Sequence, residues 1–144
     1  MTHAAGLARV VVVDDAEELR ALIRRALDRE DDFTVVGEAG DGKSGVEVAD
    51  AQQPDVVLLD IAMPVLDGLQ ALPLLRKKCP AALVVVLSGF GQDSKAAQKA
   101  LELGAHGFLN KGDSQGRLVD RLRVIRESHR ARTTWKAAPR TPAS

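Results

Sequence analysis

The chain alternates between short apolar runs and longer stretches in which apolar positions recur at helical spacing. The runs are too short for typical helices, rich in β-branched residues and bounded by charged residues, glycine or proline, as is typical of strands buried on both faces. Strands are therefore expected at residues 10–13, 33–39, 54–60, 83–87 and 107–109. Strict alternation of strands and helices predicts an α/β fold, an open, doubly wound, five-stranded parallel sheet with helices on both faces.

The first helical stretch has the clearest amphipathic pattern. Its apolar positions are Leu19, Leu22, Ile23, Ala26 and Leu27, and its opposite side holds Arg20, Arg24, Arg25 and Asp28. The later helices are expected around residues 46–49, 69–79, 96–103 and 118–125. In the third of the five helices, Pro73 removes a backbone donor at a cost of about 3 kcal/mol in a helix interior, so we expect a late start or a kink there.

The end of the chain lacks an apolar period. Residues 129–144 carry several basic side chains and two prolines but no helical pattern, and we expect them to be disordered. The predicted organisation is an extension at residues 1–8, one domain at residues 9–128 and a basic tail at residues 129–144.

Composition narrows the class of protein. A chain of 144 residues with 45% hydrophobic residues suits one domain with a two-sided core. Net charge is zero, yet residues 111–144 hold nine Lys or Arg against three acids. The single cysteine, Cys79, excludes an internal disulfide and is interpreted as buried filler. No stretch has the length of a signal peptide or membrane span, so we expect a soluble, cytoplasmic protein without membrane contact.

Polar side chains follow four of the five predicted strands. Asp14 and Asp15 follow the first, Asp60 the third, Ser88 the fourth and Lys111 the fifth. Because the carboxyl ends of parallel strands share one edge of the sheet, we expect these side chains to meet. Crowded carboxylates suit Mg²⁺, which binds one or two carboxylates together with waters and a phosphate, while lysine and serine suit phosphate oxygens. The pattern predicts a site for a phosphoryl group.

Two further motifs complete a family pattern. The loop after Asp60 contains Met63, Pro64, Asp67 and Gly68, spaced as M-P-x-x-D-G, and Phe108 stands three residues before Lys111. With the acidic pair, the aspartate, the serine and the lysine in this order, residues 9 to about 127 resemble the receiver domain of bacterial two-component response regulators, as in single-domain chemotaxis regulators. The resemblance implies the flavodoxin-like strand order 2-1-3-4-5.

The resemblance also implies roles for single residues. Asp60 is the expected phospho-acceptor, with Lys111 and Ser88 as its catalytic partners. The expected Mg²⁺ ligands are Asp14, Asp15, Asp60 and the backbone carbonyl of Ala62. Such a domain catalyses only its own phosphorylation and dephosphorylation, and its phosphoryl donor is a sensor histidine kinase or a phosphotransfer protein.

Four positions are expected to control signalling and its duration. Ser88 and Phe108 are the implied switch pair, which reshapes the surface of the fourth helix, fifth strand and fifth helix for an unknown downstream protein. Ala62 and Phe90 flank the implied path of attacking water and are expected to tune hydrolysis, because neither offers a polar group to orient that water. A plain core role for Phe108 is the alternative.

Other functions compete with this interpretation. Gly37–Ser44 satisfies G-x-x-x-x-G-K-[ST], the phosphate loop of nucleotide-binding proteins, although Glu38 and Asp41 would put negative charge near the phosphates. A phosphatase of the haloacid dehalogenase type would need an acid where Ala62 stands. A scaffold that works without phosphorylation also remains open.

The arginines near the end of the chain could touch nucleic acid, but because no aromatic residue beyond Trp135 is interleaved with them, we do not expect direct binding. The three histidines, His3, His106 and His129, show no metal-binding spacing. We interpret them as surface or linker residues.

Overall fold

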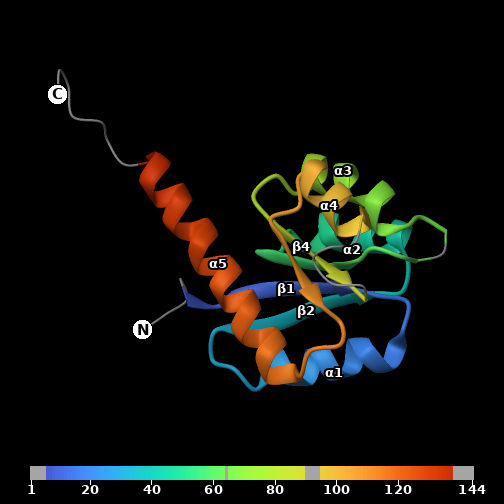
Figure 1. Cartoon of the computed structure of the whole chain (residues 1–144), viewed down its shortest axis with the longest axis horizontal. Coiled ribbons are helices and arrows are strands. Elements are labelled where there is room, and N and C mark those ends of the chain that lie inside the picture. The colour runs from blue at the N-terminus through green and yellow to red at the C-terminus, as the bar shows by residue number, and fades with distance from the viewer. Residues whose placement is uncertain (1–5, 64, 90–94, 138–144) are drawn as a thin grey trace.

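A computed structural model describes residues 6–63, 65–89 and 95–137, and the side chains of this part except those of residues 132–137. Strands and helices alternate throughout (Figure 1). Their order is β1 (Ala8–Val13), α1 (Glu17–Asp28), β2 (Phe33–Ala39), α2 (Gly42–Gln52), β3 (Val56–Asp60), α3 (Gly68–Lys78), β4 (Leu83–Ser88), α4 (Lys95–Glu102), β5 (Gly107–Asn110) and α5 (Gln115–Ala137). The strands form one parallel sheet in the order β2-β1-β3-β4-β5, which confirms the predicted fold class.

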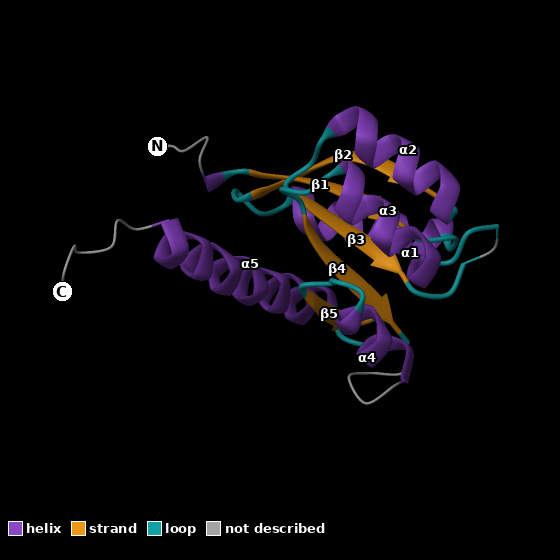
Figure 2. Cartoon of the chain, turned by 90° about the horizontal axis from the view of Figure 1, so that it is seen from above, coloured by secondary structure: helices purple, strands orange, loops and turns teal. Residues whose placement is uncertain are grey.

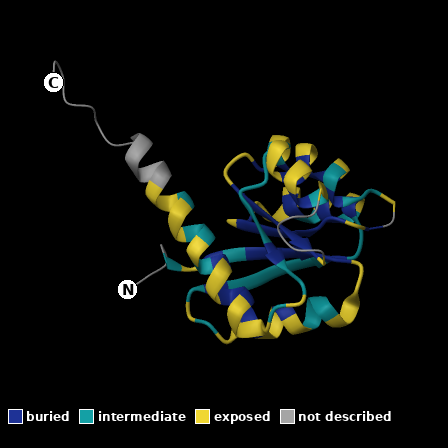
Figure 3. Ribbon diagram, viewed as in Figure 1, coloured by how far each residue is buried: buried dark blue, intermediate teal, exposed yellow. Residues whose placement is uncertain are grey.

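The sheet separates two apolar cores because successive residues of a strand point to opposite faces. In β1, Val11 and Val13 pack in the core beneath α2, α3 and α4, whereas Val10 and Val12 pack in the core beneath α1 and α5. The same alternation continues through β3 and β4, whose residues are buried along their whole length. Figure 1 shows α2, α3 and α4 on one side of the sheet and α1 on the other, Figure 2 shows α5 next to β5 and away from α2, and Figure 3 shows the buried strands between helices with exposed outer sides.

Two side chains fix the helices that start at the carboxyl edge of the sheet. Asp41 caps α2 by accepting from the Ser44 N–H at 2.8 Å, and Asp67 caps α3 in a reciprocal capping box with Gln70. At Gly68, an added Cβ would lie 2.2 Å from the Asp60 carbonyl oxygen. Glycine therefore allows α3 to begin directly against the end of β3.

This start corrects the expectation of a late beginning for the third helix. Helix α3 starts at Gly68 and contains Pro73 in its interior. The capping box and the close packing of Gly68 determine where the helix begins, and these local interactions outweigh the donor lost at the proline. The expected kink at Pro73 stays a prediction.

The expected disorder from residue 129 onward is wrong for residues 129–137. Helix α5 runs to Ala137, so the predicted boundary at residue 128 falls inside it, and its last turns extend beyond the sheet in Figure 1. Leu118, Val119 and Leu122 are buried and anchor its first half. Good helix formers then extend an existing helix without a new nucleation cost. The rest of the tail, residues 138–144, lies outside the described residues.

Arg123 ties α5 to the connection between α1 and β2. Its guanidinium contacts both carboxylate oxygens of Asp32, at 2.8 and 3.0 Å, and one of Glu30 at 2.9 Å, and lies 5.7 Å from the Phe33 ring centroid. The hydrogen bond from Arg123 lowers the pKa of the Asp32 carboxyl from 3.8. Among the described residues, no helix has both the length and the apolar character needed to cross a membrane.

A charge-removing substitution tests this tie. Because the pKa of Asp32 is lowered in the folded state, its contribution to stability is present above the unfolded value of 3.8 and is lost as pH falls through the folded value. We predict that Arg123→Gln lowers the free energy of unfolding at pH 7 by about 0.5–1 kcal/mol, a range that allows for solvent screening of this partly exposed pair. The effect should shrink near pH 3, measured by urea denaturation.

Arg117→Gln is the matched control, since it removes the same charge from an exposed position of α5. It should change stability less than Arg123→Gln at pH 7. An Arg123→Gln effect of equal size at pH 3 and pH 7 would show that the ionised Asp32 is not what Arg123 binds.

Candidate functional site

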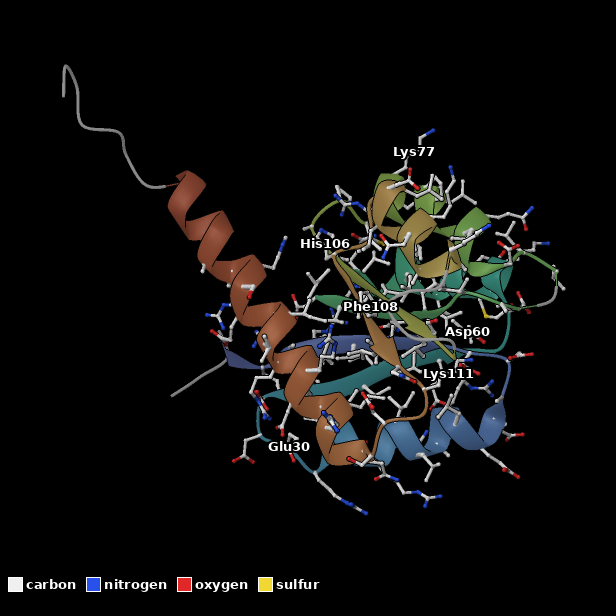
Figure 4. The ribbon with its side chains drawn as sticks, in the orientation of Figure 1. Glu30, Asp60, Lys77, His106, Phe108 and Lys111 are labelled. Atoms are coloured by element: carbon white, nitrogen blue, oxygen red, sulfur yellow. The ribbon has the colours of Figure 1, made fainter. Side chains whose placement is uncertain are left out.

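Four of the predicted residues meet at the carboxyl edge of the sheet. Asp14 directly follows β1, Asp60 ends β3, Ser88 ends β4 and Lys111 follows β5. Asp14, Asp60 and Ser88 are at most 3% exposed and are the buried polar side chains of the described part of the chain. Figure 4 shows Asp60 and Lys111 close together at this edge. Burying charged groups costs free energy, and the fold alone rarely requires it, so a buried polar cluster of this kind indicates a functional site.

Lys111 bridges two of the carboxylates. Its Nζ lies 2.9 Å from Asp60 Oδ1 and 3.1 Å from Asp14 Oδ2, and its backbone N–H donates to the Ser88 carbonyl. Burial alone would lower the pKa of the ammonium, but its hydrogen bonds to Asp60 and Asp14 and their negative charges raise it above its ordinary value. Lys111 therefore stays charged, and one cation faces two buried carboxylates.

The two oxygens of Asp60 differ. Oδ1 accepts from the Ala62 N–H at 3.1 Å and lies against Lys111, whereas Oδ2 is buried and has no hydrogen-bond partner among the described residues. Burial raises the pKa of Asp60 to about 6, helped by the charge of Asp14 and opposed by Lys111. An unpartnered buried carboxylate oxygen is expensive unless something else uses it.

Three carboxylates at this edge suit a metal ion. One oxygen each of Asp14, Asp15 and Asp60 lie within 4.8 Å of one another, with Asp15 exposed to solvent. A hard cation with oxygen ligands would relieve their repulsion. The residues present therefore fit Mg²⁺. Ala62, whose backbone carbonyl is the remaining expected ligand, is exposed and lies two residues after Asp60.

Arg20 is a site residue that the sequence analysis placed wrongly. The helical pattern put Arg20 on the outward side of α1, yet its side chain is only 18% exposed. Its Nη1 donates to the backbone carbonyl of Asp14 at 2.6 Å, and its Nε lies 3.5 Å from Glu38 Oε1. An added Cβ at Gly40 would lie 3.3 Å from the guanidinium. The sequence signal that could have revealed this orientation is the presence of Glu38 and Gly40 at the end of the second strand. Glu38 offers an ion-pair partner to an inward-facing arginine, and Gly40 leaves space for its guanidinium.

The proposed switch residues lie on neighbouring strands. Ser88 pairs with Asn110 in the β4–β5 register, and Phe108 pairs with Val86. Phe108 is half-buried and packs against the core under α3 and α4. Ala62 is exposed beside Asp60, whereas Phe90 and Pro64 lie outside the described residues. Met63 is buried and Asp67 caps α3, so this part of the M-P-x-x-D-G loop has a structural role.

In Gly37–Ser44, the alternative phosphate-loop motif, the side chain of Asp41 takes up hydrogen-bond donors at the start of α2. The Ser44 N–H at the start of α2 donates to Asp41 at 2.8 Å, and the Ser44 hydroxyl donates to the same carboxylate at 3.2 Å. An added Cβ at Gly42 would lie 1.8 Å from the Leu66 carbonyl oxygen, so the loop packs against the protein. The geometry therefore gives a capped helix rather than a cradle for nucleotide phosphates.

Two histidines are not the surface or linker residues that we expected. His106 Nδ1 accepts from the Val84 N–H at 3.0 Å, and its ring meets the His129 ring edge-on, with 4.7 Å between centroids. The pair joins the start of β5 to α5, while His3 lies outside the described residues. Cys79 is buried, as predicted.

Comparison with known proteins agrees with the geometry. Residues 10–123 match the response regulator receiver domain. The receiver domain of CheB from Thermotoga maritima superposes with a TM-score of 0.76 at 34% identity, covering 84% of this chain and 95% of that one. The signal receiver domain of NarL from Mycobacterium tuberculosis superposes with a TM-score of 0.75 at 37% identity, covering 83% and 97%.

A curated relative shows how far the similarity extends. A protein-glutamate methylesterase/protein-glutamine glutaminase from Geobacter sulfurreducens is 40% identical over 119 residues, which cover 83% of this chain and 32% of that protein. The chain thus spans about a third of such relatives, and the match falls on their receiver part. It belongs to the response regulator receiver family, the signalling domain of two-component systems.

Proposed function

We propose that Asp60 accepts a phosphoryl group from a phosphohistidine of a cytoplasmic sensor histidine kinase or phosphotransfer protein, in a reaction that depends on Mg²⁺. The observation that supports this most directly is the buried, unpartnered Oδ2 of Asp60, a carboxylate whose other oxygen, Oδ1, is held by the Lys111 ammonium. If the carboxylate served only a structural salt bridge, its second, buried oxygen would be expected to have a hydrogen-bond donor as well. A free oxygen next to a fixed cation suits a nucleophile that receives an anion.

The transfer needs little from the protein besides position and charge. A carboxylate oxygen of Asp60 attacks phosphorus, a new P–O bond forms, the P–N bond to the donor imidazole breaks, and the imidazole nitrogen keeps the electron pair. The product is an acyl phosphate on Asp60. Lys111, which already contacts Asp60 Oδ1, is placed to hold a phosphoryl oxygen, and Ser88 supplies a hydroxyl at the same edge.

Mg²⁺ would be held by Asp15, Asp60 and the backbone carbonyl of Ala62, with Asp14 acting through metal-bound water. When bound, the cation supplies positive charge against the transferring phosphoryl and the neighbouring acids. Besides its ion pair with Lys111, Asp14 is fixed by three hydrogen bonds: its N–H donates to the Ala39 carbonyl, its Oδ1 accepts from the Ala16 N–H, and its carbonyl accepts from Arg20. These contacts keep Asp14 in place without the metal.

The output is proposed to be a change at the α4-β5-α5 surface, read by a downstream protein. A groove of about 650 Å³ lies there, lined by Leu101, His106, Gly107, Phe108, Arg121, Val124, Ile125, Ser128 and Ala131. Phe108 belongs both to this lining and to the core that reaches α4. Rotation of its ring would therefore change the groove, as a population shift between two packings.

Phosphorylation of Asp60 can be measured directly. We predict that incubation with acetyl phosphate and Mg²⁺ adds one phosphate to the intact mass of the wild type and none to Asp60→Asn, because the amide cannot act as the nucleophile. Asp50→Asn, an exposed acid on α2, is the control and should be labelled like the wild type. Labelling of Asp60→Asn, or an unlabelled wild type, would contradict the proposal, and the second result would favour a phosphorylation-independent scaffold.

Mg²⁺ binding should be visible as stabilisation. We predict that millimolar Mg²⁺ raises the melting temperature of the wild type, because it relieves repulsion among Asp14, Asp15 and Asp60, and that EDTA reverses the effect. Asp15→Asn should show a clearly smaller rise. Glu17→Gln, which removes an exposed acid two residues away, should keep the wild-type response. Equal responses of the two variants would exclude Asp15 as a ligand.

The lifetime of the phosphorylated state tests the proposed hydrolysis positions. Ala62 and Phe90 offer no hydrogen bond to an attacking water, so we predict that an Ala62→Asn, Phe90→Glu double variant loses its phosphate several-fold faster than the wild type. The measurement is the decay of the phosphorylated mass after removal of the donor, with Val65→Asn as a control in the same loop. A double variant that retains phosphate as long as the wild type would show that these positions do not limit the approach of water.

A further inference from the structure

One arginine of α5 holds the proposed switch residue in two ways. Arg121 Nε donates to the Phe108 carbonyl at 3.2 Å, and its guanidinium carbon lies 5.2 Å from the centroid of the Phe108 ring. The first contact fixes the head group against β5. The second places its charge over the ring face, where a cation–π interaction is favourable.

The side chain of Phe108 has few other constraints. Its ring is half-buried, packs against the core under α4 from one side and lines the groove on the other. Phenylalanine lacks a hydroxyl group, so no hydrogen bond of its own favours one ring orientation over another. The energy difference between orientations therefore comes from packing and from Arg121.

We propose that Arg121 is a positioning residue that stabilises the resting orientation of Phe108 and thereby opposes the phosphorylated state of Asp60. This inference rests on the proposed function, in which Phe108 changes orientation when Asp60 is phosphorylated. Rotation of the ring away from the groove breaks its contact with the guanidinium, while the hydrogen bond to the backbone carbonyl keeps Arg121 in place. Arg121 thus favours the resting packing over the other one.

The same arginine couples the switch to whatever occupies the groove. Arg121 is exposed and lines the groove together with Val124 and Ser128. A carboxylate of a bound partner that pairs with Arg121 competes with the Phe108 ring for its charge. By thermodynamic linkage, such a partner favours phosphorylation of Asp60 as much as phosphorylation favours its binding.

Beryllofluoride is an acyl-phosphate analogue that binds the unmodified aspartate together with Mg²⁺. Its affinity for Asp60 therefore reports how Arg121, which lies on the α4-β5-α5 surface, affects the site. The ¹⁹F NMR signals of bound beryllofluoride give the occupied fraction of the protein without altering the Phe108 ring. In Arg121→Gln, the half-saturating beryllofluoride concentration should fall about two- to fivefold, the change expected for loss of one exposed cation–π contact. Arg121→Lys keeps the cation but lacks the guanidinium Nε, and should give a smaller change.

Arg117→Gln is the matched control. It removes one positive charge from an exposed position one helical turn earlier on α5, and should leave the half-saturating concentration unchanged. If Arg121→Gln binds beryllofluoride no more tightly than Arg117→Gln, Arg121 does not oppose the switch, although the proposed function stands. A wild type that binds no beryllofluoride overturns both.

Discussion

The structure depends on charge buried at the ends of parallel strands. Asp14 and Asp60 are withdrawn from solvent and share the Lys111 ammonium, at 3.1 and 2.9 Å. Burial raises the pKa of Asp60 to about 6 despite Lys111, and the charge of Asp14 adds to the rise, because one cation between two carboxylates leaves an excess of negative charge. This imbalance supports the proposed binding of a cation and a phosphoryl group, since a metal, or a transferred anion together with its metal, would complete the charge.

The fold makes this imbalance possible. Central strands covered on both faces must be apolar, so their polar residues are confined to the strand ends, and parallel pairing puts those ends at one edge. The close packing of Gly68 then places the start of α3 against the backbone of Asp60, while the Asp67 capping box holds the loop between them. The carboxylate is fixed by its surroundings before any ligand arrives, which is how a site of this kind lowers a barrier by position and electrostatics.

Features that depend on local pattern were predictable from the sequence. The apolar runs gave the strands to within a few residues, and the polar residues after them gave Asp14, Asp60, Ser88 and Lys111, because position in a parallel strand determines position in the site. Features that depend on long-range partners were not. The inward direction of Arg20 requires Glu38 and Gly40 from another strand, and the contact of His106 with His129 requires the register of α5 on the sheet. The full length of α5 was not predicted, because a helix anchored at Leu118 and Leu122 can continue without an apolar period.

The attachment of α5 also indicates which wall of the α4-β5-α5 groove would move in the proposed switch at Phe108. Arg123 attaches this helix to Asp32 and Glu30, which lie just before β2. These two residues are distant from Phe108 in the sequence and do not line the groove. Arg121, two residues earlier, reaches β5 instead. A helix held by Arg123 provides a fixed reference, so a change in Phe108 alters the β5 and α4 wall relative to it. If Phe108 changes orientation as proposed, the groove would change shape while α5 keeps its place, because Arg123 binds the connection between α1 and β2 whereas Arg121 binds β5.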